Sequence, residues 1–183
     1  MNNEIRAVYT DSTVRVYQAY DHIIADEALA LGTFGKHFKM DRMTWIKPSF
    51  LWMMYRCGWG NKEKQERILA IDLKRDAFNY IINNAVLSTY DAAIYTNKEE
   101  WKSAILSSDI RVQWDPERDV WGNPLNYRSI QLGLRGDAVK SYVNEWIIGI
   151  TDISDYVHQL YKMRNEGKNI SDLLPREQTY IMK

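Results

Sequence analysis

The sequence has 183 residues, of which 45% are hydrophobic and 26% are charged, a composition typical of a globular protein. Lys and Arg number 24 and so do Asp and Glu, and this zero net charge argues against an obligate nucleic-acid coat protein, although a local basic patch stays possible. One cysteine, Cys57, excludes an intramolecular disulfide, and no apolar run reaches the roughly 18 residues of a membrane span, so we expect a cytoplasmic protein without a membrane partner.

The first forty residues predict two strands and then a helix. Residues 5–9 and 13–20 alternate as strands do, around a Thr-Asp-Ser turn. Asp21 is a good N-cap for a helix over residues 22–31, which Gly32 would end.

The stretch 42–59 combines cations, aromatic residues and a strand-to-helix junction. Residues 43–46 predict a short strand, Pro48 suits the first position of a helix, and Gly58 suits its end. The helix is apolar nearly all round, as buried helices are. Its N-terminus, with Lys47 beside it and Arg42 upstream, is a candidate seat for an anion such as phosphate. A solvated basic loop is the alternative interpretation of the same charges.

The middle of the chain continues the mixed pattern. We expect a strand over residues 67–73, a helix capped by Asp76, and a helix that begins with the capping box at Asn97 and runs to about residue 106. Residues 110–114 alternate as a strand. They run into 115–119, which Pro116 would force into a turn or an extended loop.

The last third predicts a strand over residues 128–134 and two helices, one from Asp137 to Ile150 and one over 152–164. We therefore expect an α+β fold, with a single globular domain over residues 1–164 and a polar C-terminal tail over 165–183. Its mixed or antiparallel sheet would have about six strands with helices packed on it.

Four motifs together resemble the family catalogued as domain of unknown function 4291. They are VYQAY at residues 16–20, RMTWIKPSFLWMMYR at 42–56, VQWDPERD at 112–119 and RSIQLGL at 128–134. The resemblance extends over nearly the whole chain, to about residue 150 or beyond. It implies a family without implying a mechanism.

Most familiar catalytic signatures are absent from the sequence. His22, His37 and His158 lack metal-ligand spacing to one another or to acids, so we expect no metal site. There is no Gly-rich phosphate loop, no nucleophile elbow and no dinucleotide fingerprint. Cys57 is expected to be a buried, inert thiol.

The order of elements is similar to that of ADP-ribosyltransferase folds, in which a late strand carries a carboxylate. Residues 17–18, 45–49 and 113–117 could occupy the three functional places of such a fold. This analogy implies a nucleotide-binding enzyme that cleaves the nicotinamide–ribose bond of NAD and transfers ADP-ribose. Such an enzyme holds a pyrophosphate with cations, and a carboxylate stabilises the oxocarbenium-like centre.

In this hypothesis Glu117 or Asp115 is the catalytic carboxylate and Gln113 hydrogen-bonds the ribose. Arg42 and Lys47 would bind phosphate. The further candidate ligand-binding residues are Tyr17 and Trp45, either of which could stack on a ring, with Gln18, Ser49, Arg118, Arg128 and Gln131. The alternative for residues 115–119 is a salt-bridged turn, and for Arg128 with Gln131 a pair on the sheet surface.

Two other classes of function stay open. A nucleic-acid or nucleotide binding module without catalysis would track phosphates with the cations of residues 36–56 and stack bases on Trp59, Trp114 or Trp121. An interaction protein would use the Trp-rich motifs only to build its core. The sequence leaves the oligomeric state open.

Overall fold

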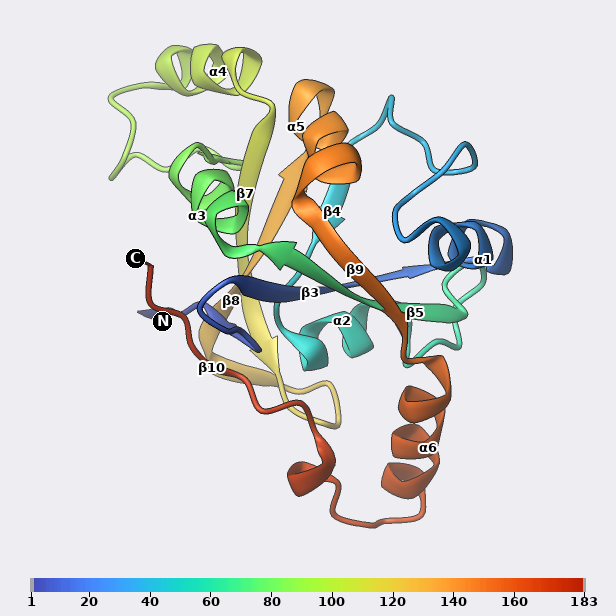
Figure 1. Cartoon of the computed structure of the whole chain (residues 1–183). Helices are drawn as coiled ribbons and strands as arrows, with labels where there is room; N and C mark the ends of the chain where they lie inside the picture. The colour runs from blue at the N-terminus through green and yellow to red at the C-terminus, as the bar shows by residue number, and fades with distance from the viewer. Residues whose placement is uncertain (1, 183) are drawn as a thin grey trace.

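The computed structural model describes residues 2–182, which form one α+β domain with two main sheets (Figure 1). The larger sheet has the order β1-β8-β7-β6, and β4 pairs with β8 beside it. The smaller sheet has the antiparallel order β3-β5-β9. The strands of the larger sheet are β1 (Asn2–Asn3), β4 (Thr44–Ile46), β6 (Val86–Leu87), β7 (Ile110–Arg118) and β8 (Pro124–Leu134). Those of the smaller sheet are β3 (Thr13–Tyr20), β5 (Arg67–Lys74) and β9 (Ile147–Asp152).

The helices surround these sheets. In Figure 1, α3, α4 and α5 lie toward one end of the molecule, α6 lies toward the other, and α2 lies near the centre. The helices are α1 (His22–Leu31), α2 (Phe50–Cys57), α3 (Arg75–Asn83), α4 (Lys98–Ser107), α5 (Gly136–Ser141) and α6 (Ser154–Asn165), with a π-helical turn Tyr142–Trp146 and a 3-10 turn Ser171–Leu173.

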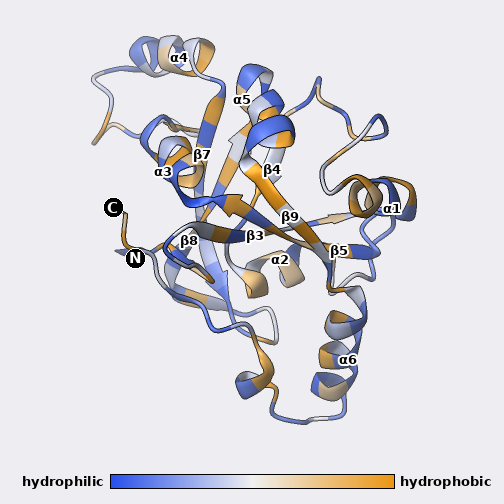
Figure 2. Ribbon diagram, viewed as in Figure 1, coloured by the Kyte–Doolittle hydropathy of each residue, from blue (hydrophilic) through white to orange (hydrophobic). Residues whose placement is uncertain are grey.

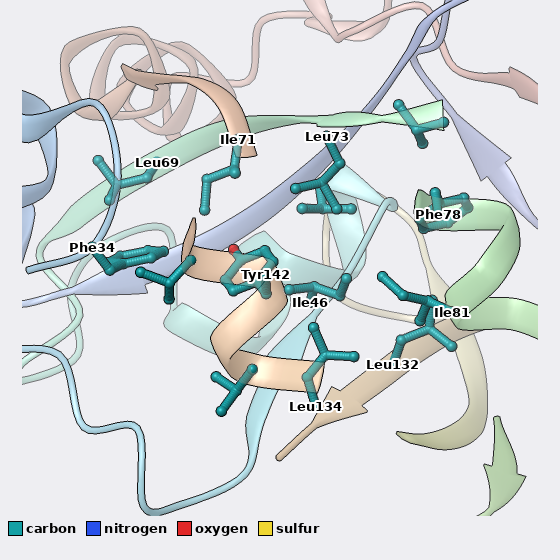
Figure 3. Close-up of a cluster of buried hydrophobic side chains, with 14 of the residues drawn as sticks. Phe34, Ile46, Leu69, Ile71, Leu73, Phe78, Ile81, Leu132, Leu134 and Tyr142 are labelled. Atoms are coloured by element: carbon teal, nitrogen blue, oxygen red, sulfur yellow. The ribbon is translucent and has the colours of Figure 1, made fainter. Parts of the chain in front are cut away.

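The main core fills the space between the two sheets. Figure 3 shows side chains from both: Ile46, Leu132 and Leu134 from the larger sheet, Leu69, Ile71 and Leu73 from the smaller one, and Tyr142 among them. A second buried cluster surrounds α2 and includes Phe50, Met54, Cys57, Val157 and Leu160. In Figure 2, the strand β9 is mostly hydrophobic along its length, while the loop after α6 is hydrophilic. Cys57 is buried, and burial raises the pKa of its thiol.

Alternation along the larger sheet gives it one apolar and one polar face. The even-numbered residues in the paired halves of β7 and β8, such as Val112, Ile130 and Leu132, pack into the core. Successive side chains of a strand point to opposite faces, so the odd-numbered residues form a polar face on the other side. The polar face is defined by Trp45 and Lys47 next to Gln113, Asp115, Glu117, Ser129 and Gln131.

The turn predicted for residues 115–119 is wrong, because β7 continues through them to Arg118. Asp115 pairs with Ser129 and Pro116 with Arg128, and the register then shifts before Arg118 pairs with Pro124. Proline is tolerated where a bulge interrupts the ladder, so it does not end this strand.

The helix predicted from Asp137 to Ile150 is also wrong beyond its first turns. α5 ends at Ser141, the π-helical turn follows, and β9 begins at Ile147. Ile147 and Ile150 are β-branched and pair with Leu73 and Ile71 of β5, so tertiary pairing overrides the helical spacing of the sequence.

Two of the predicted helix starts are confirmed. Asp21 accepts the Ile24 N–H at the start of α1, and Asn97 accepts the Glu100 N–H at the start of α4. Two details are wrong. Ser49, not Pro48, begins α2, because its hydroxyl accepts the Trp52 N–H at 3.1 Å. In α3, Asp76 lies inside the first turn and does not cap it.

Residues 165–183 were expected as a polar tail after the domain, and their described part packs on it. The short strand β10 (Gln178–Thr179) pairs with β2 (Arg6–Ala7). Ile170 and Tyr180 are buried, and Tyr180 contacts the rings of Tyr9 and Phe78. The C-terminal segment therefore connects the N-terminal strand, α3 and α2.

Candidate anion-binding site

A cavity of about 720 Å³ opens beside the junction between β4 and α2. Its described lining includes five cationic side chains, those of Lys39, Arg42, Lys47, Arg56 and Lys64. Within residues 2–182 the lining contains one carboxylate, Asp21, which already accepts the Ile24 N–H at 2.9 Å. We call this hollow the basic cavity, because its positive charge is not balanced by its own walls.

Lys47 is the most buried of these cations, with 6% of its surface exposed. Its ammonium donates to the Trp45 carbonyl at 3.4 Å and lies 5.3 Å from the Trp52 ring centroid. Within residues 2–182 no carboxylate forms a salt bridge with it. Burial and, to a smaller extent, the Arg56 charge lower its pKa to about 8, although Asp115 acts in the opposite direction. A buried ammonium without a salt-bridged carboxylate favours an external anion.

Gln18 links the strand β4, which lines the basic cavity, to the buried core through two hydrogen bonds. Its amide donates to the Trp45 carbonyl at 2.9 Å, and its oxygen accepts the Tyr142 hydroxyl at 2.7 Å. The backbone N–H of Tyr17 donates to the Lys47 carbonyl at 2.7 Å. The structure therefore brings the first two predicted motifs together. The Tyr17 ring, however, is 1% exposed, packs on Phe50 and does not line the cavity.

Gln113, Asp115 and Gln131 form a hydrogen-bonded group on the polar face. The two carboxylate oxygens of Asp115 accept the Gln113 amide at 2.9 Å and the Gln131 amide at 2.6 Å. These residues share a face with Trp45 and Lys47, but none of them lines the basic cavity. Asp115 is nevertheless close enough to Lys47 to act on its pKa.

Glu117 and Ser49 lie together at the N-terminus of α2, outside the basic cavity. Glu117 is 3% exposed, and burial raises its pKa, while hydrogen bonds from Arg118, Ser49 and Ser129 act against this rise. The helix terminus itself is already occupied by a carboxyl group of the chain. An oxygen of Glu177 accepts the Phe50 N–H at 2.6 Å.

Glu177 has no counterpart in the sequence prediction. Burial and, to a smaller extent, the neighbouring Glu117 raise its pKa to about 8. Phe50 and Glu177 are 127 residues apart, so no local pattern could have joined them. The helix terminus at which the sequence predicted an anion is thus occupied by the Glu177 carboxyl group of the C-terminal segment, and Arg42 and Lys47 line the basic cavity instead.

A model of the family described as a domain of unknown function, number 4291, matches residues 4–180. The chain belongs to this family. No curated protein matches the chain. The match includes all four motifs that suggested the resemblance, and every cationic residue of the basic cavity lies within it.

In this family member, two predicted site residues lie away from the basic cavity. The Arg118 guanidinium stacks on the Tyr55 ring at 4.1 Å and donates to the Gly122 carbonyl at 3.3 Å. Arg128 is exposed on β8, where it pairs with Asn3 of β1. Neither residue lines the basic cavity.

Lys64 is a cavity residue that the sequence prediction missed, since it lies in a polar loop beyond the basic stretch. It adopts a left-handed backbone conformation, with a φ of 63°, and lies in the lining of the basic cavity. Within the described residues, no three His, Cys, Asp or Glu side chains are arranged to hold a metal ion. In the same part of the chain, no helix is long and apolar enough to cross a membrane.

Proposed function

We propose that the protein binds a nucleotide, with the phosphates held in the basic cavity. The observation that supports this most directly is the charge of the described lining, in which five cations face one carboxylate that caps a helix. Phosphate oxygens form charge-assisted hydrogen bonds with such groups. A volume of about 720 Å³ is also within the usual range for a small-molecule site.

In this proposal Lys47 holds a phosphate from the floor of the cavity, and Arg42 and Arg56 hold it from the rim. Trp45, which also lines the cavity, provides an aromatic face for a base or nicotinamide ring. Gln18 positions the Trp45 carbonyl and so fixes the strand that carries both Trp45 and Lys47.

A narrower form of the proposal is ADP-ribosyl transfer from NAD. One observation favours it, namely that Asp115 lies on the polar face and acts electrostatically on Lys47. Gln113 and Gln131 hold its carboxylate in place. With NAD bound and its ribose extending from the basic cavity past Lys47 to the polar face, Asp115 would stabilise the oxocarbenium-like ribose as the bond to nicotinamide breaks, and an acceptor nucleophile would then attack the same carbon. Glu117, beside Ser49, is the second candidate for this role.

A thermal-shift screen tests nucleotide binding. Nucleoside triphosphates and NAD are added to the wild type, to Lys47→Ala and to Lys102→Ala, an exposed lysine of α4 that serves as the control. A ligand at 100 times its Kd adds about 2.7 kcal/mol of stability. We expect at least one nucleotide to stabilise the wild type and the control, and Lys47→Ala to lose that shift. A wild type that no nucleotide stabilises would contradict the proposal.

Release of nicotinamide tests the narrower form separately. We expect the wild type to release nicotinamide from NAD, and Asp115→Asn to lose at least about 100-fold in rate, as when one electrostatic stabiliser is removed. Loss with Glu117→Gln alone would move the role to Glu117. Binding of NAD without any release would leave a nucleotide binding module without catalysis.

A further inference from the structure

A second, smaller hollow of about 130 Å³ lies on the other side of α2 from the basic cavity. Met53 and Arg56 line the basic cavity, whereas Met54, Tyr55 and Gly58 line this second hollow. The C-terminal end of α2 is therefore the ridge between the two. Arg56 lies on this ridge, and Lys62 donates to its backbone carbonyl at 2.5 Å.

The loop between β7 and β8 holds an exposed tryptophan in a fixed place over the hollow. Trp121 is 58% exposed. Asp119 accepts the backbone N–H groups of Trp121 and Asn123 at 2.8 Å each, and the Asn123 amide at 2.9 Å. Gly122 has a φ of 87°, and a Cβ there would lie 3.3 Å from the Tyr55 ring. The loop is thus preorganised, and the Asp119 carboxylate is used within the loop to hold its turn.

Guanidinium groups and aromatic rings alternate across this surface. The Arg164 guanidinium lies 4.7 Å from the Tyr161 ring, 5.2 Å from Trp59 and 5.4 Å from Trp121. Arg118 stacks on Tyr55, which is 44% exposed. Within residues 2–182 neither arginine forms a salt bridge. We define the stacking surface as Tyr55, Arg118, Trp121 and Arg164.

We infer that the stacking surface binds a single-stranded nucleic acid whose terminal nucleotide occupies the basic cavity. This inference rests on the proposed function and names the ligand class more closely. Bases of any sequence stack on aromatic side chains and on guanidinium planes. Arg56, at the end of α2 between the two hollows, lies where backbone phosphates would cross from one to the other.

Charge and ring chemistry favour this ligand over an acidic peptide. Carboxylate side chains would pair with the two arginines but would leave the exposed faces of Trp121 and Tyr55 without a stacking partner. A strand of nucleotides supplies a phosphate and a flat base at each step. It therefore matches both parts of the stacking surface.

The test is fluorescence anisotropy with a labelled oligouridylate of about twelve nucleotides, within the usual site size for single strands. The proteins are the wild type, Trp121→Ala and Tyr80→Ala. Tyr80 is a matched control, because it is 53% exposed and contacts Trp146 in a different hollow. Base stacking contributes about 1–3 kcal/mol, so we expect Trp121→Ala to weaken binding roughly 5- to 150-fold. Tyr80→Ala should bind as the wild type does.

Mononucleotide binding is measured on the same proteins by thermal shift. Trp121→Ala should keep the wild-type shift, since Trp121 does not line the basic cavity. The inference is overturned if the oligonucleotide binds no more tightly than the mononucleotide, if the two variants weaken it equally, or if polyglutamate competes as well as RNA. These results would leave nucleotide binding in the cavity intact, whereas the absence of any mononucleotide shift would overturn both.

Discussion

Lys47 holds a positive charge at a place where water is largely excluded. Burial disfavours the charged form and lowers the pKa of Lys47 to about 8. The side chain is still mainly protonated at neutral pH. A bound phosphate would compensate the desolvated ammonium. This residue therefore links the fold of the β4–α2 junction to the chemistry of the basic cavity.

Affinity for a nucleotide should fall as the pH rises from about 7 to about 9. Lys47 loses its proton through a pKa of about 8 and then no longer attracts phosphate. Titration calorimetry across this range should give a weakening in the wild type. Lys47→Arg, which stays charged, should bind with a nearly flat profile, and an equally steep profile for it would contradict this role.

Side chains lie close to Gly133, which pairs with Trp45 across β4 and β8. A Cβ at Gly133 would lie 2.6 Å from the Met43 sulfur and 3.0 Å from the Trp45 ring. Both of those side chains line the basic cavity. The absence of a side chain at one position of β8 therefore shapes the wall on which a ligand would lie.

Gly133→Ala should weaken nucleotide binding several-fold and reduce stability by about 1–3 kcal/mol, because the added methyl group pushes Met43 and Trp45 outward. The binding constant and the midpoint of urea unfolding measure the two effects. Gly149→Ala in β9 is the control, since its Cβ would have nothing within 4 Å. Equal binding by both variants would show that this wall does not contact the ligand.

The elements that could be predicted from the sequence are those with local signals. Asp21 and Asn97 cap helices with their own side chains, and Gly58 ends α2 in the left-handed conformation. The extension of β7 through Pro116 and the strand β9 depend on pairing with distant strands. Short-range spacing carries no information about those partners, so these two predictions failed.

The residues of the candidate site also divide into those with a local sequence signal and those without one. Arg42 and Lys47 stand out within one basic stretch, and the structure places both in the cavity lining. Lys64 reaches the cavity by the fold of a loop, and Glu177 reaches α2 from the far end of the chain. Neither position carries a local sequence signal.

At the scale of the whole molecule, the C-terminal segment closes the domain. Arg75 donates to the Ile181 carbonyl at 2.6 Å, Arg6 donates to the Glu177 carbonyl at 3.1 Å, and β10 pairs with β2. The Glu177 carboxyl group accepts the Phe50 N–H, and it interacts electrostatically with Glu117, Arg6 and Tyr17. The segment is thus held partly by a carboxyl group that favours its protonated form.

Stability should therefore fall as the pH rises through about 8. The folded-state pKa of Glu177 is raised to about 8 from an ordinary 4.5, so its contribution is fully present below about pH 4.5 and is lost above pH 8. Glu177→Gln mimics the protonated form and should lose less stability between pH 6 and pH 9 than the wild type. In this size class 1 kcal/mol corresponds to about 2–4 °C in Tm.

Calorimetric melting of the wild type, Glu177→Gln and Glu166→Gln at both pH values measures this effect. Glu166 is exposed and pairs with Lys168, so its substitution should leave the wild-type pH dependence unchanged. If Glu177→Gln loses as much stability at high pH as the wild type, the carboxyl group does not control attachment of the segment.

Photolabelling with 8-azido-ATP followed by peptide mass spectrometry tests the central claim most directly, because it locates the bound nucleotide. We expect the label in peptides that contain residues 18–24, 37–47 or 53–65, which line the basic cavity, with competition by excess ATP and loss in Lys47→Ala. Specific labelling confined to other peptides, such as those around Tyr80 and Trp146, or no labelling that ATP displaces, would contradict the account.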